Sequence, residues 1–122
     1  MNATEHYSTS PKSMGAMKRE LPDVANVFHA FHQPLMADGA ISGQQKELIA
    51  IGISIAIRCE SCIYAHVQRA RKIGASREEI LDAARVAVMM QGGPGYAYLP
   101  KVIDALDALQ ATETRTRESV SR

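Results

Sequence analysis

The stretch from Glu47 to His66 reads ELIAIGISIAIRCESCIYAH. An acidic residue opens it, an apolar run follows, and a Cys-x-x-Cys motif lies one helical turn before the final histidine. Apolar residues fill nearly every position from Leu48 to Ile57, which is typical of a helix surrounded by protein. The isoleucines would also suit a buried strand, but no second strand is available to pair with it, so we expect a helix.

The start of this helix is marked by a capping pattern. Ser42 is followed three residues later by Gln45, a pair that can cap the first turn reciprocally. We therefore expect a helix over residues 43–58. Glu47 and Ser54 fall on one face of it, the single polar stripe on an otherwise apolar surface.

Three further boundaries follow towards the C-terminus. A helix is predicted from the cysteines to about Lys72, with Gly74 as its C-terminal cap. Ser76–Glu79 is a second capping box and predicts another helix. The glycine-rich residues 91–95 end that helix, and a last helix is expected with Pro100 in its first turn.

Before the central stretch, residues 17–33 show helical spacing of apolar side chains. Pro22 is expected in the first turn of the main part of this helix, and Pro34 is expected to end or kink it. His29 and His32, three residues apart, could share a metal ion. With no cysteine or carboxylate beside them, we favour histidines on a helix surface or interface.

The 122 residues suffice for one domain of about five helices, so the predicted fold class is all-α. Residues 1–15 and 111–122 are polar and are expected to be loosely ordered, which leaves a helical domain over residues 16–110. Apolar residues make up 46% of the chain, without tryptophan. So small a domain with so much apolar surface is expected to form a homo-oligomer.

Charge and hydropathy exclude several classes of function. A net charge of +1 with scattered lysine and arginine argues against nucleic-acid binding. No apolar run is long enough to span a membrane, and the N-terminus lacks the pattern of a signal peptide. A cytoplasmic protein is expected. Paired cysteines in that compartment indicate redox chemistry or metal binding.

Cys59 and Cys62 lie at a predicted helix start, where unpaired N–H groups and the helix dipole stabilise a thiolate. His66 lies four residues after Cys62 on the same face and could accept the thiol proton. Three readings remain open: a dithiol redox site, a zinc site with Glu47 as the fourth ligand, and two inert core cysteines.

Glu47 could orient His66, as the third member of a nucleophile–base–orienter set does. A straight helix from Glu47 to Arg58 is about 17 Å long. A simple hairpin would then place Glu47 beside residues well beyond His66, so a bend, an offset packing or a neighbouring subunit would be needed to bring it to Cys62. An acid at a helix start also has a purely structural explanation, since it complements the dipole.

Together, Glu47, Cys59, Cys62 and His66 form the pattern E-x11-C-x2-C-x3-H. This pattern resembles the core signature of the AhpD-like alkylhydroperoxidases, within the carboxymuconolactone decarboxylase family. The resemblance extends over about residues 17–109 and places the chain among the short, single-core members.

The resemblance implies an all-helical domain that assembles into trimers or hexamers and a peroxidase that needs no cofactor. Cys62 would attack the hydroperoxide substrate, and Cys59 would resolve the resulting sulfenic acid and protonate the leaving alkoxide. Glu47 and His66 would form the proton relay. An external thiol, such as a dihydrolipoyl group or a thioredoxin-like partner, would reduce the disulfide.

One departure from the family pattern concerns Ser61, where the best-known members carry a histidine. The relay is then one group shorter, so rate or reductant could differ. The decarboxylases of the family generally lack the two cysteines, which argues against that activity here. A non-catalytic redox-sensing or electron-relay dithiol and a zinc-stabilised module are the alternatives.

Overall fold

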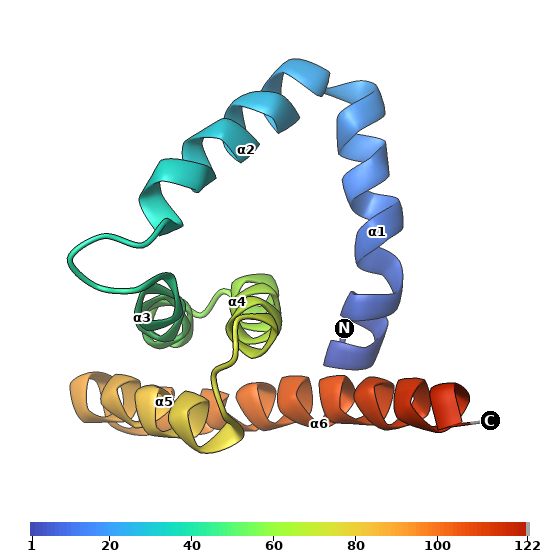
Figure 1. Cartoon of the computed structure of the whole chain (residues 1–122). Coiled ribbons are helices and arrows are strands. Elements are labelled where there is room, and N and C mark those ends of the chain that lie inside the picture. The colour runs from blue at the N-terminus through green and yellow to red at the C-terminus, as the bar shows by residue number, and fades with distance from the viewer. Residues whose placement is uncertain (122) are drawn as a thin grey trace.

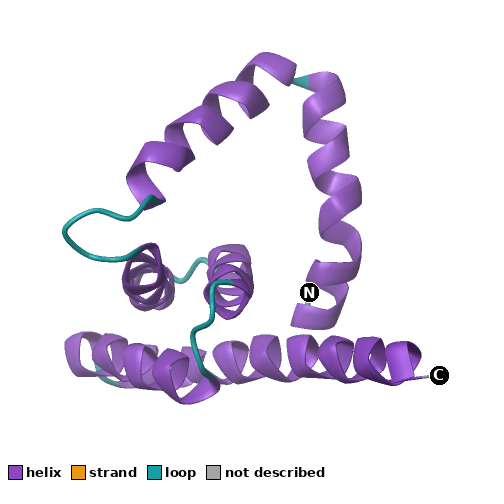
Figure 2. Ribbon diagram, viewed as in Figure 1, coloured by secondary structure: helices purple, strands orange, loops and turns teal. Residues whose placement is uncertain are grey.

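The computed structural model describes residues 1–121 and is built from six α-helices, with no strand in that range (Figures 1 and 2). The predicted all-α class is confirmed, with one helix more than expected. The helices are α1 (Ala3–Glu20), α2 (Pro22–Met36), α3 (Gly43–Ala56), α4 (Glu60–Lys72), α5 (Arg77–Gln91) and α6 (Gly93–Ser121).

The body of the molecule consists of α3 and α4 laid across α5 and α6 (Figure 1). α3 packs on α4 and α5, and α4 packs on α6. The largest fully buried side chains come from all four helices: Ile51, Ile55, Ile63, Val67, Ile80 and Val102. Each contributes about 1.5–3 kcal/mol through burial, so this aliphatic core fixes α3 and α4 side by side.

Both predicted capping boxes are present. The Ser42 side chain accepts from the backbone N–H of Gln45, whose side chain accepts from the backbone of Ser42. Ser76 and Glu79 do the same at the start of α5. These local interactions set where α3 and α5 begin.

The N-terminal residues differ from the expectation of a loosely ordered segment, because they form α1. Asn2 caps this helix in a box with Glu5. The backbone N–H of Ala3 donates to Asp104 of α6 at 2.8 Å, and the Tyr7 hydroxyl donates to the carbonyl of Tyr64 at 2.6 Å. These contacts bind the first turns of α1 to the body.

The helix predicted over residues 17–33 is divided at Leu21. Its first residues belong to α1, and Pro22 occupies the first position of α2, as expected. α2 extends past Pro34 to Met36 and has no buried residue. Together α1 and α2 form an arch that stands away from the body (Figure 1).

The last helix is longer than predicted. α6 begins at Gly93, so Pro100 lies inside the helix and not in its first turn. Residues 111–121 continue the helix, although most of them are exposed. An ion pair between Arg71 and Glu113, with an N–O distance of 3.4 Å, holds the near part of this extension against α4. Arg122 lies outside the described residues.

One face of α3 is exposed, in contrast to the expectation of a helix surrounded by protein. The exposed fractions of Ile49, Ile53 and Ile57 are 52%, 54% and 65%. The reason is that α4 and α5 cover two sides of α3, while α2 and α6 contact it at only a few positions. Large apolar side chains of α2, among them Phe28 and Phe31, are also exposed.

No helix among residues 1–121 combines the length and the apolar character required to cross a bilayer.

Candidate functional site

The backbone between α3 and α4 fixes the position of the first cysteine. Arg58 has φ +57°, the left-handed conformation that closes many helices. Its N–H donates to the carbonyl of Ile55 at 3.1 Å, and the N–H of Cys59 donates to the carbonyl of Ser54 at 3.0 Å. This Schellman pattern ends α3 and places Cys59 directly at the next helix start.

Cys59 is also the N-cap of α4. Its sulfur accepts from the backbone N–H of Cys62 at 3.3 Å. The two cysteines are joined by a disulfide, with Cα atoms 5.1 Å apart, and both are half-buried. The sulfurs therefore meet at the positive end of the α4 dipole without rearrangement of the backbone. The Ser61 hydroxyl lies 3.7 Å from the Cys59 sulfur.

Glu47 and His66 form a second pair within the same chain. The Nδ1 atom of His66 lies 2.6 Å from a carboxylate oxygen of Glu47. Glu47 is only 4% exposed, and a buried carboxylate needs such a partner. A neighbouring subunit is not required, because Glu47 and His66 meet within one chain through the packing of α3 against α4.

The pair occupies one ring nitrogen of His66 and leaves Nε2 for other chemistry. His66 follows Cys62 by four residues on α4, so the two side chains lie on one face about 6 Å apart along the axis. No hydrogen bond joins the cysteine pair to the Glu47–His66 pair within residues 1–121. Cys62 and His66 are thus neighbours on α4, and Glu47 reaches His66 from α3.

His32 of α2 faces the same region. Its Nε2 atom is buried, with no hydrogen-bond partner among the described residues. Burial lowers the pKa of His32 below its ordinary value, the positive charges of Arg69, His66 and His29 act in the same direction, and Glu47 opposes them. His32 is half-buried in the single chain, and its place at a helix surface or interface stays a prediction. Helical spacing within α2 could not reveal these charge interactions, because it does not give the position of α2 relative to α3 and α4.

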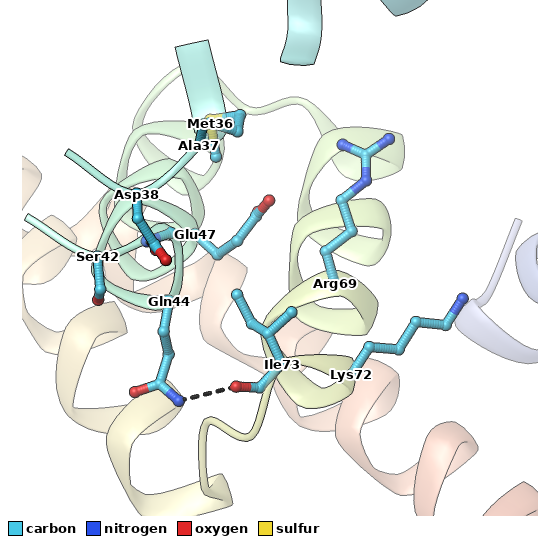
Figure 3. A pocket seen from close by; sticks show the side chains of 10 residues that line it. Met36, Ala37, Asp38, Ser42, Gln44, Glu47, Arg69, Lys72 and Ile73 are labelled. Atoms are coloured by element: carbon cyan, nitrogen blue, oxygen red, sulfur yellow. Dashed lines mark hydrogen bonds between the residues drawn. The ribbon is translucent and has the colours of Figure 1, made fainter. Parts of the chain in front are cut away.

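A cavity of about 570 Å³ lies beside this cluster, between the α2–α3 connection and the C-terminal half of α4. Figure 3 shows Glu47 and Arg69 extending from α3 and α4 on its two sides. It is lined by Met36, Ala37, Asp38, Ser42, Gly43, Gln44, Glu47, Arg69, Lys72 and Ile73.

The described residues contain no cluster of three or more histidine, cysteine, aspartate and glutamate side chains that could hold a metal ion. The four side chains of the alternative zinc reading are divided into two pairs: Cys59 is bonded to Cys62, and Glu47 contacts His66. The geometry can support thiol–disulfide chemistry beside a histidine–carboxylate pair.

Residues 22–111 match the model of the carboxymuconolactone decarboxylase family. Two similar sequences are uncharacterized proteins. One, from the cox locus of Paracoccus denitrificans, is 34% identical over 97 residues, covering 80% of this chain and 87% of the relative. The other, from Haemophilus influenzae, is 31% identical over 107 residues, covering 88% and 95%.

Solved structures of the same family share the fold. A family protein from Legionella pneumophila has a TM-score of 0.73 and 33% identity, covering 89% of this chain and 92% of its own. One from Thermotoga maritima, for which a part in the antioxidative response has been suggested, has a TM-score of 0.76 and 23% identity, covering 90% and 94%. The second likeness concerns the fold alone.

Proposed function

The chain belongs to the carboxymuconolactone decarboxylase family, and on this basis we propose that it is a thiol-dependent peroxidase acting through Cys59 and Cys62. The observation that carries the proposal is the position of the disulfide. It lies half-buried at the start of α4, one turn before a histidine that is hydrogen-bonded to a buried glutamate. Such a site combines a stabilised thiolate, a resolving thiol and a proton acceptor.

In the first step, His66 accepts the proton of the Cys62 thiol, while Glu47 holds the imidazole in place through Nδ1. The Cys62 thiolate attacks the distal oxygen of the hydroperoxide. An S–O bond forms as the O–O bond breaks, which yields a Cys62 sulfenic acid and an alkoxide. The substrate is thereby reduced by two electrons.

In the second step, the Cys59 thiol gives its proton to the alkoxide, which leaves as an alcohol. The Cys59 thiolate then attacks the Cys62 sulfur and expels hydroxide, which takes the proton held by His66 and leaves as water. The product is the Cys59–Cys62 disulfide. The sum is one hydroperoxide and two thiols converted to one alcohol, one water and one disulfide.

The cycle needs an external dithiol to return two electrons to the disulfide. In a reducing compartment such as the cytoplasm, a dihydrolipoyl group or a thioredoxin-like protein would supply them. The exposed Ser61 between the cysteines leaves this end of α4 open to such a partner.

The test is consumption of cumene hydroperoxide with a dithiol reductant in the parent, Cys62→Ser and Cys59→Ser proteins. We expect Cys62→Ser to lose consumption, and Cys59→Ser to accumulate a sulfenic acid that dimedone traps. Consumption by Cys62→Ser at the parent rate would contradict the proposal. A disulfide that forms without turnover would indicate a redox sensor or relay, and a stoichiometric metal in the purified protein would indicate the zinc-stabilised module.

A further inference from the structure

The cavity beside the Glu47–His66 pair contains two positive charges with no partner on the chain. Neither Arg69 nor Lys72 makes an ion pair or side-chain hydrogen bond within residues 1–121. Arg69 is half-buried, so its guanidinium is less screened than one on the open surface. An unpaired guanidinium in a cavity is suited to bind an anion.

The other polar groups of the cavity are already engaged. The Gln44 amide donates to the carbonyl of Ile73 at 3.1 Å, as Figure 3 shows. Asp38 accepts from the N–H of Gly43 at 2.6 Å, and Glu47 is bound to His66. The acids of the cavity therefore have local partners, and Arg69 and Lys72 are the groups left to meet a ligand.

The position of Arg69 relates the cavity to the dithiol. Arg69 follows Cys62 by seven residues, two turns of α4, which is about 10 Å along the axis. Side chains on a helix lean towards its N-terminus, and this shortens the gap between the guanidinium and the sulfur. In Figure 3 the Arg69 guanidinium and the Glu47 carboxylate extend towards the same side. A molecule of modest size can therefore extend from the Arg69 guanidinium to the Cys62 sulfur.

The rest of the lining is suited to an apolar body. Met36, Ala37 and Ile73 contribute apolar surface, and a volume of about 570 Å³ is within the range of small-molecule sites. The cavity thus offers an apolar wall beside the Arg69 guanidinium, whereas the Lys72 side chain extends away from Arg69 (Figure 3).

We propose that this cavity binds the substrate, and that the preferred substrate is a hydroperoxide carrying a carboxylate on an apolar body. The carboxylate binds Arg69, the body lies against the Met36 side of the cavity, and the peroxide is directed along α4 towards Cys62. This inference rests on the proposed peroxidase function, and it names the class of hydroperoxide.

The test compares cumene hydroperoxide bearing a para-carboxylate with its methyl ester. The ratio of kcat/KM for the acid to that for the ester isolates the carboxylate, because any change in thiol reactivity cancels. We expect the parent to favour the acid by roughly tenfold or more, the effect of one charge-assisted hydrogen bond. In Arg69→Gln the ratio should fall towards one, and Lys72→Gln should lower it less.

Arg85→Gln is the matched control, because it removes the same charge from an exposed position on α5 outside the cavity. Its ratio should equal that of the parent. A parent ratio near one, or a ratio unchanged in Arg69→Gln, would overturn the inference while leaving the peroxidase intact.

If neither peroxide is consumed, the proposed function fails. A direct binding measurement then still tests whether the cavity binds an anion. The probe is then the carboxylated cumyl alcohol, measured by calorimetry. Binding by the parent that Arg69→Gln weakens tenfold or more would support an anion site at Arg69. Absence of binding to the parent would overturn it.

Discussion

At the scale of single residues, the contact between Glu47 and His66 joins two parts of the central stretch that lie 19 positions apart. The carboxylate is buried and the imidazole is partly exposed, and the contact through Nδ1 leaves the second ring nitrogen of His66 unoccupied by Glu47. A proton acceptor held in this way is what a neighbouring thiol needs in order to react at neutral pH.

The first prediction concerns this pair. In a Cys59→Ser background, Glu47→Gln and His66→Ala should each move the alkylation of Cys62 by iodoacetamide to higher pH and slow it about tenfold at pH 7, since the thiol loses its proton acceptor or the group that orients it. The measurement is the alkylation rate against pH. Gln68→Ala, two residues after His66 on another face of α4, is the control. Superimposable profiles would remove both residues from the relay.

The second prediction concerns His32, whose pKa is lowered by burial and by the charge of Arg69. Because the folded state binds a proton less readily than the unfolded state, folding stability should fall as the pH drops below about 6.5. His32→Gln should reduce this loss, and His29→Gln, an exposed change on the same helix, should not. Urea unfolding at pH 7.5 and pH 5.5 provides the measurement. An equal loss in His32→Gln and in the parent would contradict it.

At the scale of elements, α3 and α4 end in the same backbone conformation with different residues at the left-handed position. Gly74 after α4 has φ +96° and Arg58 after α3 has φ +57°. Both positions require a left-handed backbone, which glycine adopts freely and an arginine adopts at a cost. The costly position is the one directly before Cys59.

This difference gives a third prediction. Arg58→Gly should raise the free energy of unfolding by roughly 0.5–1 kcal/mol, because relief of strain exceeds the added entropy of the unfolded chain. Gly74→Ala should lower the free energy of unfolding by about 1 kcal/mol. Denaturant titration of the two variants beside the parent measures both. The account of these caps is wrong if the two substitutions shift stability in the same direction.

The elements also explain what could be predicted from the sequence. The starts of α3 and α5 were predictable because Ser42 and Ser76 act within their own first turns. α1 was not, because its polar composition indicates disorder, while the bonds that hold it reach Tyr64 and Asp104, far away in the sequence. Such contacts have no local pattern.

The candidate site likewise has features that the sequence predicts and features that it does not. The spacing of Cys59, Cys62 and His66 on one helix follows from helix geometry, so the sequence could place them together. Their contact with Glu47 depends on the packing of α3 against α4 and on the reach of a side chain, neither of which spacing gives. The burial of the His32 Nε2 atom and its charge interactions with Arg69 and Glu47 depend on where α2 lies in the fold, which spacing does not give.

At the scale of the whole molecule, the apolar surface is larger than one chain covers. The exposed Ile49 and Ile53 of α3 are continued on α5 by Val86 and Met90, and these four side chains help to line an apolar hollow of about 340 Å³. The apolar stripe of α2 is exposed as well. Contiguous surfaces of this kind typically mark association sites, and we propose that the chain forms a homo-oligomer, for which the family resemblance implies a trimer or hexamer.

The fourth prediction follows from this surface. Light scattering after gel filtration should give a multiple of the chain mass, and Ile53→Glu should shift the population towards the monomer, because a charge would be buried against apolar groups. Val120→Glu, at an exposed position near the end of α6, is the control. A parent that stays monomeric at micromolar concentration would contradict the proposal.

The proposed function requires that Cys62, with Cys59, reduces a hydroperoxide in the absence of any other redox group. The most direct measurement mixes the reduced protein with one equivalent of cumene hydroperoxide and counts free thiols and remaining peroxide in quenched samples. The account predicts that two thiols per chain disappear for each peroxide lost, with a Cys59–Cys62 disulfide as the product. Peroxide that persists while both thiols remain free would contradict it.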